Sequence, residues 1–359
     1  VNDDDSDDDT ADYMLENYVF SFTTAEGCGD PFTPIYDIQG NGAATPISGQ
    51  TVTTEGIVTG DFQTGGKRGF FIQDEMGDDD PATSDGIFVY YPNAIEVNVG
   101  DKVRVTGRAN EYYQLTQLTG SAMQICSSGN SITPLELTLP FDSKNHEPIE
   151  GMLVTFPQAL VLSEYFNFDR YGELLLTSTR HTTPTAYLEP GPDAVAAQEA
   201  HLLDSIAVDD GSSTQNPEYL RHPDGTAFGL DHYFRGGDTI EGLTGVMDYN
   251  FNEYKIQPVG TATYTSVNPR TEAPELVVGE IRVASLNVLN YFVTIDTGTP
   301  ICGPAGDMEC RGADNETELE RQTVKIINAI VGMDADIVGL IEIENEHPGQ
   351  TADEPVATI

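Results

Sequence analysis

A strand–helix–strand pattern near the end of the chain constrains its fold more than any other feature. The first segment, Ile281 to Phe292, is predicted as a strand whose apolar alternation runs up to Asn287. The second segment, Ala335 to Asn345, carries a nearly continuous apolar run before Glu342. Between them, apolar residues recur at helical spacing over 319–330. A unit of this kind aligns its two strands in parallel, so both strands end at the same edge of a sheet. Asn287 and Glu342 are therefore expected to meet in one crevice.

The helix between these strands has start and stop signals of its own. Asn315 and Glu318 have the spacing of a capping box, and Gly332 is placed to stop the helix. A carboxylate and a carboxamide at one sheet edge are typical ligands of hard cations and partners of phosphate oxygens. A Glu after an apolar strand is also commonly a solvated strand end, and an Asn there is commonly a turn former.

At these residues the chain resembles the endonuclease/exonuclease/phosphatase superfamily. In that family a first strand ends in Asn, and a later D-I-V-x-x-x-E strand supplies the Glu that binds the catalytic Mg²⁺; these fall on Asn287 and, along DIVGLIE, on Glu342. The chain is more similar still to the large secreted nucleases of bacteria (the ExeM type). They share SLNVLNYF, a CRGAD segment (Cys310–Asp314) with ERQ (Glu320–Gln322), and the closing GLIEIEN. This resemblance covers residues 18 to 345.

The resemblance implies a secreted nuclease that hydrolyses phosphodiester bonds of extracellular DNA or RNA. Asn287 and Glu342 would be catalytic, and Glu342 would hold Mg²⁺ or Mn²⁺, with Ca²⁺ as a structural or activating ion. Two alternatives stay open: a phosphatase or phosphodiesterase of the same superfamily, and a non-enzymatic, acidic, calcium-binding adhesion module. The family's other ligands and its His and Asp lie further downstream, whereas seventeen residues follow Glu342. We therefore expect an incomplete catalytic domain that is inactive by itself.

The charge of the chain bears on its partners and surroundings. Asp and Glu total 59 against 16 Lys and Arg, a formal net charge of −43. Such a surface argues against broad affinity for nucleic acids or anionic membranes, so a DNA substrate would depend on local Arg residues and divalent cations. Seven of the first twelve residues are Asp, which fits either a Ca²⁺ loop or a solvated acidic loop. We expect a secreted or cell-surface-attached protein in a salty, extracellular habitat.

Four cysteines, an even number, fit an oxidising compartment. Their spacing is wrong for paired zinc knuckles and no histidine neighbours them, which disfavours zinc. Cys28 and Cys126 flank the first folded region, and Cys302 and Cys310 bracket a short loop, so we predict the disulfides Cys28–Cys126 and Cys302–Cys310. No segment approaches the roughly 20 apolar residues of a membrane span. The N-terminus carries no signal peptide and is expected to be internal to a longer protein.

Most of the chain is predicted to be β. Residues 28–130 form short alternating runs separated by Gly, Asp and Pro, which suits a small Greek-key barrel of the OB type. Gly100–Leu115 (GDKVRVTGRANEYYQL) recurs as Gly237–Ile256 (GDTIEGLTGVMDYNFNEYKI), which predicts a second OB-like barrel over 131–265. That barrel is enlarged by an insertion at 179–235.

The remaining segments complete the predicted organisation. Residues 1–27 resemble the end of an upstream immunoglobulin-like β-domain followed by a linker. The Pro-containing stretch 266–279 is a second linker, and 280–359 is the beginning of an α/β sandwich of the endonuclease/exonuclease/phosphatase type. The fold class is thus multidomain and mainly β, with two OB-like barrels before the α/β part.

OB barrels commonly bind single strands by stacking bases on aromatic side chains beside basic residues. The candidates chosen for the first barrel are Lys67, Arg68, Tyr112 and Tyr113. Weaker candidates are Phe70, Phe71, Tyr90, Tyr91, Arg104 and Arg108. Since side chains alternate along a strand, one member of each aromatic pair should face the core and the other should cover a barrel edge. The insertion carries DDGS (Asp209–Ser212) and four scattered histidines, interpreted as surface or packing residues: His181, His201, His222 and His232.

Overall fold

The computed structural model describes residues 27–64, 66–212, 214–303 and 305–344, and the chain is mainly β over these residues. It divides into two compact units, Val1–Pro269 and Arg270–Ile359, with the boundary inside the predicted linker 266–279. The segment predicted to end an upstream β-domain, residues 1–27, lies outside the described residues except for Gly27. None of the described helices is long and apolar enough to cross a membrane.

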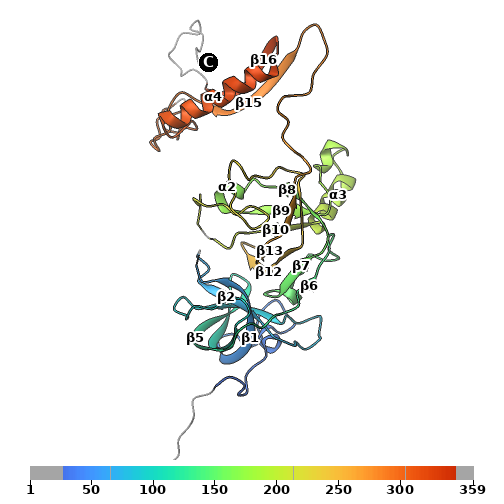
Figure 1. Ribbon diagram of the computed structural model, residues 1–359, viewed down its shortest axis with the longest axis vertical. Coiled ribbons are helices and arrows are strands. Elements are labelled where there is room, and N and C mark those ends of the chain that lie inside the picture. Colours follow the sequence, from blue (N-terminus) through green and yellow to red (C-terminus); the bar gives the residue numbers. More distant parts are fainter. Residues whose placement is uncertain (1–26, 65, 213, 304, 345–359) are drawn as a thin grey trace, which may run out of the picture. The chain divides into compact units, whose positions relative to one another are not determined.

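Unit 1 opens with a closed five-stranded barrel, drawn in blue to teal in Figure 1. Its strands are β1 (Thr51–Phe62), β2 (Gly69–Gln73), β3 (Gly86–Tyr90), β4 (Lys102–Tyr112) and β5 (Leu115–Ser127), in the order β1-β2-β3-β5-β4. The apolar residues of the alternating runs fill the interior, together with the short helix α1 (Ile35–Gln39). Cys28 and Cys126 are joined in a disulfide.

The second part of unit 1 is one nine-stranded sheet, whereas we expected a second OB-like Greek-key barrel. Its order is β14-β11-β8-β9-β10-β13-β12-β7-β6. The strands are β6 (Leu135–Glu136), β7 (Leu153–Phe156), β8 (Leu160–Glu164), β9 (Leu174–Thr177), β10 (Ser205–Val208), β11 (Thr239–Glu241), β12 (Leu243–Asn250), β13 (Glu253–Pro258) and β14 (Thr263–Thr265). The helical segments are η1 (Glu147–Ile149), α2 (Phe168–Tyr171), η2 (Pro184–Ala186) and α3 (Pro192–Leu203).

The difference has a physical cause in the insertion 179–235. It contributes β10, which pairs antiparallel with β9 and parallel with β13. A strand added in the middle of the sheet widens it, and the added α3 lies outside the sheet. The insertion is therefore part of the domain's core and not only a surface loop.

The internal repeat is visible in the backbone. Gly100 and Gly237 both have positive φ, +93° and +95°, which glycine adopts at no steric cost. In the first copy, the N–H of Gly100 donates to the carbonyl of Val58 (2.9 Å). In the second copy, the N–H of Gly237 donates to the carbonyl of Leu162 (2.8 Å). The two segments therefore dock against neighbouring strands in the same way.

Each copy then ends in a two-residue hairpin. Tyr113 and Gln114 connect β4 to β5, and Phe251 and Asn252 connect β12 to β13. All four have positive φ, between 51° and 71°, as in a type I′ turn. The Nε2 of Gln114 donates to Oδ1 of Asn252 at 3.4 Å, so the two hairpin tips touch.

The barrel and the sheet pack closely against each other. Phe71, Phe88, Leu115, Leu153 and Val246 form a buried cluster between them. Beside this cluster the backbones of two glycines meet: a Cβ built on residue 86 would lie 2.2 Å from the carbonyl carbon of residue 151. Unit 1 is thus held by apolar packing and by backbone contact.

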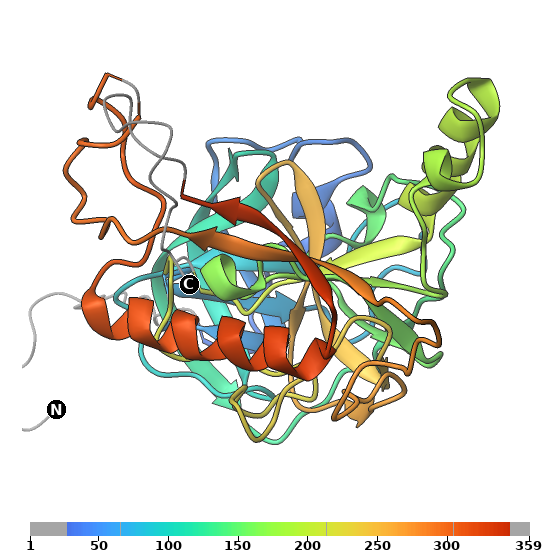
Figure 2. The same ribbon diagram turned by 90° about the horizontal axis from the view of Figure 1, so that it is seen from above.

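Unit 2 contains the predicted strand, helix and strand: β15 (Val283–Tyr291), α4 (Glu316–Met333) and β16 (Ile337–Ile343). The strands pair in parallel, and Figures 1 and 2 show α4 lying along them. Oδ1 of Asn315 accepts a hydrogen bond from the N–H of Glu318 (3.0 Å), as the capping box predicts. The expected stop at Gly332 was wrong by two residues, because Asp334 takes the left-handed conformation that ends the helix.

Candidate functional site

The ends of β15 and β16 bring two polar side chains into direct contact. Asn287 pairs with Ile341 in the parallel ladder, and Ile341 directly precedes Glu342. The Nδ2 of Asn287 donates to Oε1 of Glu342 at 2.8 Å, and the N–H of Asn290 donates to Oε2 at 3.3 Å. Both side chains are exposed. The two residues predicted from the sequence therefore share one sheet edge.

The backbone at this edge departs from regular strand geometry. Leu289, Asn290 and Glu342 have positive φ, and the register shifts between Asn287 and Tyr291. Non-glycine residues in this region are strained and persist where the surroundings hold them. Here Oδ1 of Asn287 accepts from the N–H of Leu289 (2.9 Å), which fixes the turn. Hydrogen bonds from Asn287 and Asn290 hold the Glu342 carboxylate beside the amide.

The two other segments that carry the family resemblance lie next to this contact. A hollow of about 260 Å³ is lined by Asn290, by Arg311, Gly312 and Ala313 of CRGAD, and by Gln322 of ERQ. The Nε2 of Gln322 donates to the carbonyl of Leu289 at 2.9 Å. Cys310, the first residue of CRGAD, forms a disulfide with Cys302. Residues far apart in sequence thus converge beside Glu342.

Glu344 is a residue of this region that the sequence did not single out. Its carboxylate accepts from the N–H groups of Val293 (2.8 Å) and Thr294 (3.1 Å) and from the Thr294 hydroxyl. It anchors the loop that follows β15. The sequence signal for Glu344 was the second Glu of GLIEIEN. It follows Glu342 by two residues, which is the spacing of side chains on one face of a strand.

One face of the two-stranded sheet carries exposed apolar side chains. Val283 and Ile337 are register partners, 72 % and 56 % exposed, and Ile341 is 53 % exposed. The opposite face packs Leu286 and Leu340 against α4, with Ile326 buried. The described part of unit 2 therefore has one covered and one uncovered sheet face.

A second candidate site lies in unit 1, in a cleft of about 1040 Å³ between the barrel and the sheet, named here the barrel–sheet cleft. All four residues chosen as nucleic-acid contacts line it: Lys67, Arg68, Tyr112 and Tyr113. The two hairpin tips supply its most exposed aromatic rings, with Tyr113 78 % and Phe251 83 % exposed. Exposed rings of this kind can stack on a planar ligand.

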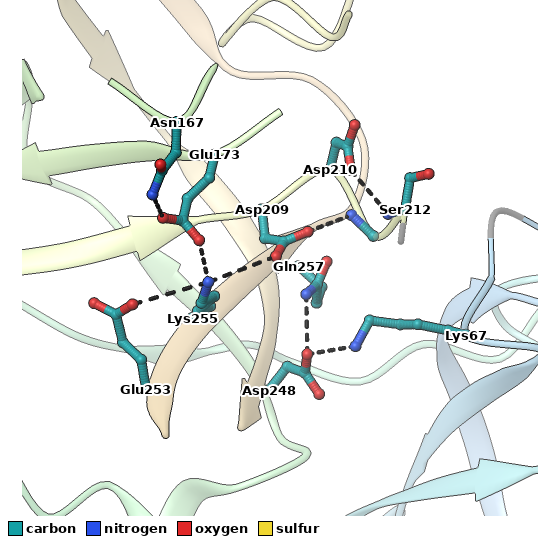
Figure 3. A network of polar contacts seen from close by, with 11 residues as sticks. Lys67, Asn167, Glu173, Asp209, Asp210, Ser212, Asp248, Glu253, Lys255 and Gln257 are labelled. Atoms are coloured by element: carbon teal, nitrogen blue, oxygen red, sulfur yellow. Dashed lines mark hydrogen bonds and ion pairs between the residues drawn. The ribbon is translucent and has the colours of Figure 1, made fainter. Parts of the chain in front are cut away.

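The polar residues of this cleft form the network in Figure 3. Lys67 pairs with Asp248 at 2.5 Å, and Asp248 is fully buried and also accepts from Gln257 (2.9 Å). Lys255 contacts Glu173, and Asp209 lies 3.8 Å from it. Burial raises the pKa of Asp209, while a backbone hydrogen bond and the charge of Lys255 oppose the rise.

The charges in this cleft bear on the predicted nucleic-acid contacts. Both lysines are neutralised by carboxylates within the network, and Arg68 is exposed. Phe70 packs in the barrel core and Phe71 in the barrel–sheet cluster, so neither ring is free to stack. Arg104 is likewise buried in an ion pair with Glu55 (2.9 Å). Nucleic-acid binding by Lys67, Arg68, Tyr112 and Tyr113 stays a prediction.

The four histidines of the insertion fall into two pairs. His181 and His201 stack with ring centroids 4.0 Å apart, and Nε2 of His181 lies 2.6 Å from Asp204. His222 and His232 are also 4.0 Å apart, on either side of Asp224. The interpretation as scattered histidines missed this pairing, because it depends on how the insertion folds back on itself.

Comparison with known proteins adds one match. A family model described as a domain of unknown function (DUF8508) matches residues 124–269, which include all nine strands of the sheet. No curated protein matches the chain.

Proposed function

We propose that this chain is part of a secreted, metal-dependent nuclease that hydrolyses phosphodiester bonds of extracellular DNA or RNA. The observation that carries the proposal is the contact between Asn287 and Glu342 at the ends of two parallel strands joined by a helix. The CRGAD and ERQ residues that line the adjacent hollow support the same assignment. The two disulfides are compatible with an extracellular protein.

The fold supports this proposal at two places. The closed order β1-β2-β3-β5-β4 fits an OB-like barrel, a type that accompanies catalytic domains in the nucleases this chain resembles. The parallel unit β15–α4–β16 fits the beginning of the superfamily's α/β sandwich. Its uncovered apolar face is where further strands of such a sandwich would pack.

The donor set fits a hard divalent cation held with water and substrate oxygens. Glu342 offers an exposed carboxylate, and Asn287 offers an amide beside it. Mg²⁺ is commonly held by one or two carboxylates and completes its shell from water and phosphate. Bound there, such a cation would neutralise charge that develops on the phosphate. The Asn287 amide keeps the Glu342 carboxylate oriented and can donate to a phosphate oxygen.

The proposal is tested with plasmid DNA in Mg²⁺ or Mn²⁺, using the protein as its complete gene encodes it. Glu342→Gln and Asn287→Ala should each lower the cleavage rate by roughly 100-fold or more, since removing one charge-stabilising group costs about that much. The matched control is Glu316→Gln, which removes an exposed carboxylate from the start of α4.

Three outcomes would redirect the assignment. Hydrolysis of phosphomonoesters with DNA left intact would favour a phosphatase of the same superfamily. Absence of any metal-dependent hydrolysis would favour an adhesion module. Equal cleavage by Glu342→Gln and the Glu316→Gln control would place the active site elsewhere.

A further inference from the structure

His222, Asp224 and His232 converge at the turn that closes the insertion of unit 1. Nδ1 of His222 lies 2.9 Å from Oδ1 of Asp224, and Nε2 of His232 lies 2.8 Å from Oδ2. One ligand atom from each residue falls within 4.8 Å of the others, the one such group among the described residues. The cluster belongs to unit 1 and is separate from the contact between Asn287 and Glu342.

The cluster lies at the boundary between core and solvent. The side chain of His222 is fully buried, that of Asp224 is 18 % exposed and that of His232 is 45 % exposed. The rings of Tyr264 and Phe234 pack on His222, with centroids 4.7 and 5.9 Å away. The three side chains thus have an apolar wall on one side and an opening on the side of His232.

The electrostatics of the three side chains add to this geometry. Burial is the largest influence on the pKa of His222 and lowers it, which disfavours a proton on the ring. Burial acts to raise the pKa of Asp224, but hydrogen bonds from Thr226 and from the two histidines hold it well below its usual range.

Hydrogen bonds within the protein do not satisfy His222. Its Nδ1 lies 3.2 Å from the N–H of Asp224, which needs a lone pair on Nδ1, and 2.9 Å from the carboxylate, which needs a proton there. One nitrogen cannot meet both needs in one tautomer. The conflict at Nδ1 calls for an explanation, and an ion between Nδ1 and the carboxylate is one. If the ion takes the Nδ1 lone pair, the proton moves to the buried Nε2, where the backbone of Tyr233 is the group that can accept it.

We propose that His222, Asp224 and His232 bind a divalent transition-metal ion. Imidazole nitrogen with a carboxylate oxygen is the donor set of Zn²⁺ and its first-row neighbours, whereas Mg²⁺ and Ca²⁺ prefer oxygen alone. An ion accepts lone pairs from His222 and Asp224 at once, which removes the conflict over the proton. Three protein ligands leave a position toward solvent beside His232 for water or another ligand.

Binding would also cross-link this region. The carbonyl of Asp224 accepts from the N–H of Ala262 at 3.2 Å, which ties the turn to the segment between β13 and β14. His232 follows in the next turn, where it pairs with Gly229. A metal held by all three side chains would join these turns, so metal binding should stabilise the folded unit.

The test is a Co²⁺ titration of the metal-stripped chain, followed by Zn²⁺ competition. All proteins carry Glu342→Gln so that the carboxylate of unit 2 contributes no binding. We expect one equivalent of Co²⁺ with a visible spectrum that reports imidazole ligation, displaced by Zn²⁺. His232→Ala and Asp224→Asn should weaken Co²⁺ binding by more than the roughly 10- to 100-fold that loss of an outer-shell partner costs.

The matched control is the double variant His181→Ala/His201→Ala, which removes the other histidine pair of the insertion. It should bind Co²⁺ as tightly as the parent. Circular dichroism without metal checks that His232→Ala, whose side chain is partly exposed, is folded. The proposal is overturned if the parent binds no Co²⁺, if His232→Ala binds it equally well, or if the control loses as much affinity.

Discussion

Glu150 lies wholly buried between the barrel and the sheet, with more negative than positive neighbours. Its Oε1 accepts from the N–H of Thr116 at 2.9 Å, and its Oε2 has no partner among the described residues. Burial, together with the charge of Glu147, raises the pKa of Glu150 to about 9. The side chain is therefore protonated in the folded protein at neutral pH.

Protonation of Glu150 makes stability depend on pH. Between the ordinary value of 4.5 and about 9, the folded protein holds a proton that the unfolded chain releases. Stability from this group is therefore fully present below pH 4.5 and falls as pH rises, by about 1.4 kcal/mol per pH unit at most. Glu150→Gln should remove this slope and stabilise the protein by roughly 1–3 kcal/mol at pH 8.

Urea unfolding at pH 6 and pH 8 measures the effect of Glu150→Gln as a difference from the parent, so other titrating groups cancel. Glu189→Gln, at an exposed position, is the matched control and should leave the difference between the two pH values unchanged. An unaltered slope in Glu150→Gln would mean that the carboxyl is ionised in the folded state.

At the scale of elements, the contact between residues 86 and 151 joins the start of β3 to the turn before β7. Gly151 has a φ of +77°, and Gln39 donates to the carbonyl of Gly86 at 2.6 Å, so neither backbone can retreat easily. Overpacking of a tight contact typically costs about 1–3 kcal/mol. Because a Cβ here would meet backbone atoms, we expect Gly86→Ala to lower the unfolding free energy by at least that amount.

Thermal unfolding and limited proteolysis of Gly86→Ala would check this, with cleavage expected between the barrel and the sheet. Gly42→Ala is the matched control, because a Cβ there meets no atom within 4 Å and its φ is not positive. A Gly86→Ala protein as stable as the control would show that the two parts can separate at little cost.

How far the elements could be predicted depended on how local their signals are. The helix α4 and its Asn315 cap follow from spacing within one turn, and the strands of the first barrel follow from alternation and turn residues. The internal repeat could also be predicted, since the glycines and the hairpins of the two copies occur at equivalent positions in the sequence. The nine-stranded sheet that replaces the expected second barrel could not be predicted, because β10 enters it from an insertion without a repeat of its own.

The candidate sites also differ in whether local sequence signals could predict them. Asn287 and Glu342 were predictable because both lie at the ends of apolar runs in one parallel unit. The network around Lys67 and Asp248 joins residues 181 positions apart, and no local sequence pattern predicts such a pair. The same is true of His222 and His232, whose approach requires two turns to fold against each other.

At the scale of the whole molecule, the formal net charge of −43 dominates the electrostatics. Self-repulsion of like charges destabilises a compact state, and added salt screens it. The Debye length is about 10 Å at 0.1 M salt and about 30 Å at 0.01 M, so most of the relief comes at low concentrations. We expect the melting temperature to rise between 0.02 and 0.3 M NaCl at pH 7.5, most steeply at the low end of this range.

Differential scanning calorimetry measures this salt dependence, and the same series at pH 4 is the control. Many carboxylates are protonated at that pH, so the rise with salt should shrink. A melting temperature that is independent of salt at pH 7.5 would show that paired charges, and not net repulsion, govern stability.

The disulfide between Cys28 and Cys126 joins residues 98 positions apart, and the loop that it closes contains the barrel strands up to the end of β5. A chain pulled from its two ends would carry tension across this sulfur–sulfur link and not through the strands. The pulling force would therefore not act on the barrel strands, and the barrel would stay folded while the sheet and unit 2 unfold. A protease that nicks a barrel loop between the two cysteines would likewise leave its pieces tethered. Of the parts of the chain that the structure describes, the barrel is therefore the one that a single cut or a pull from the ends would disturb least.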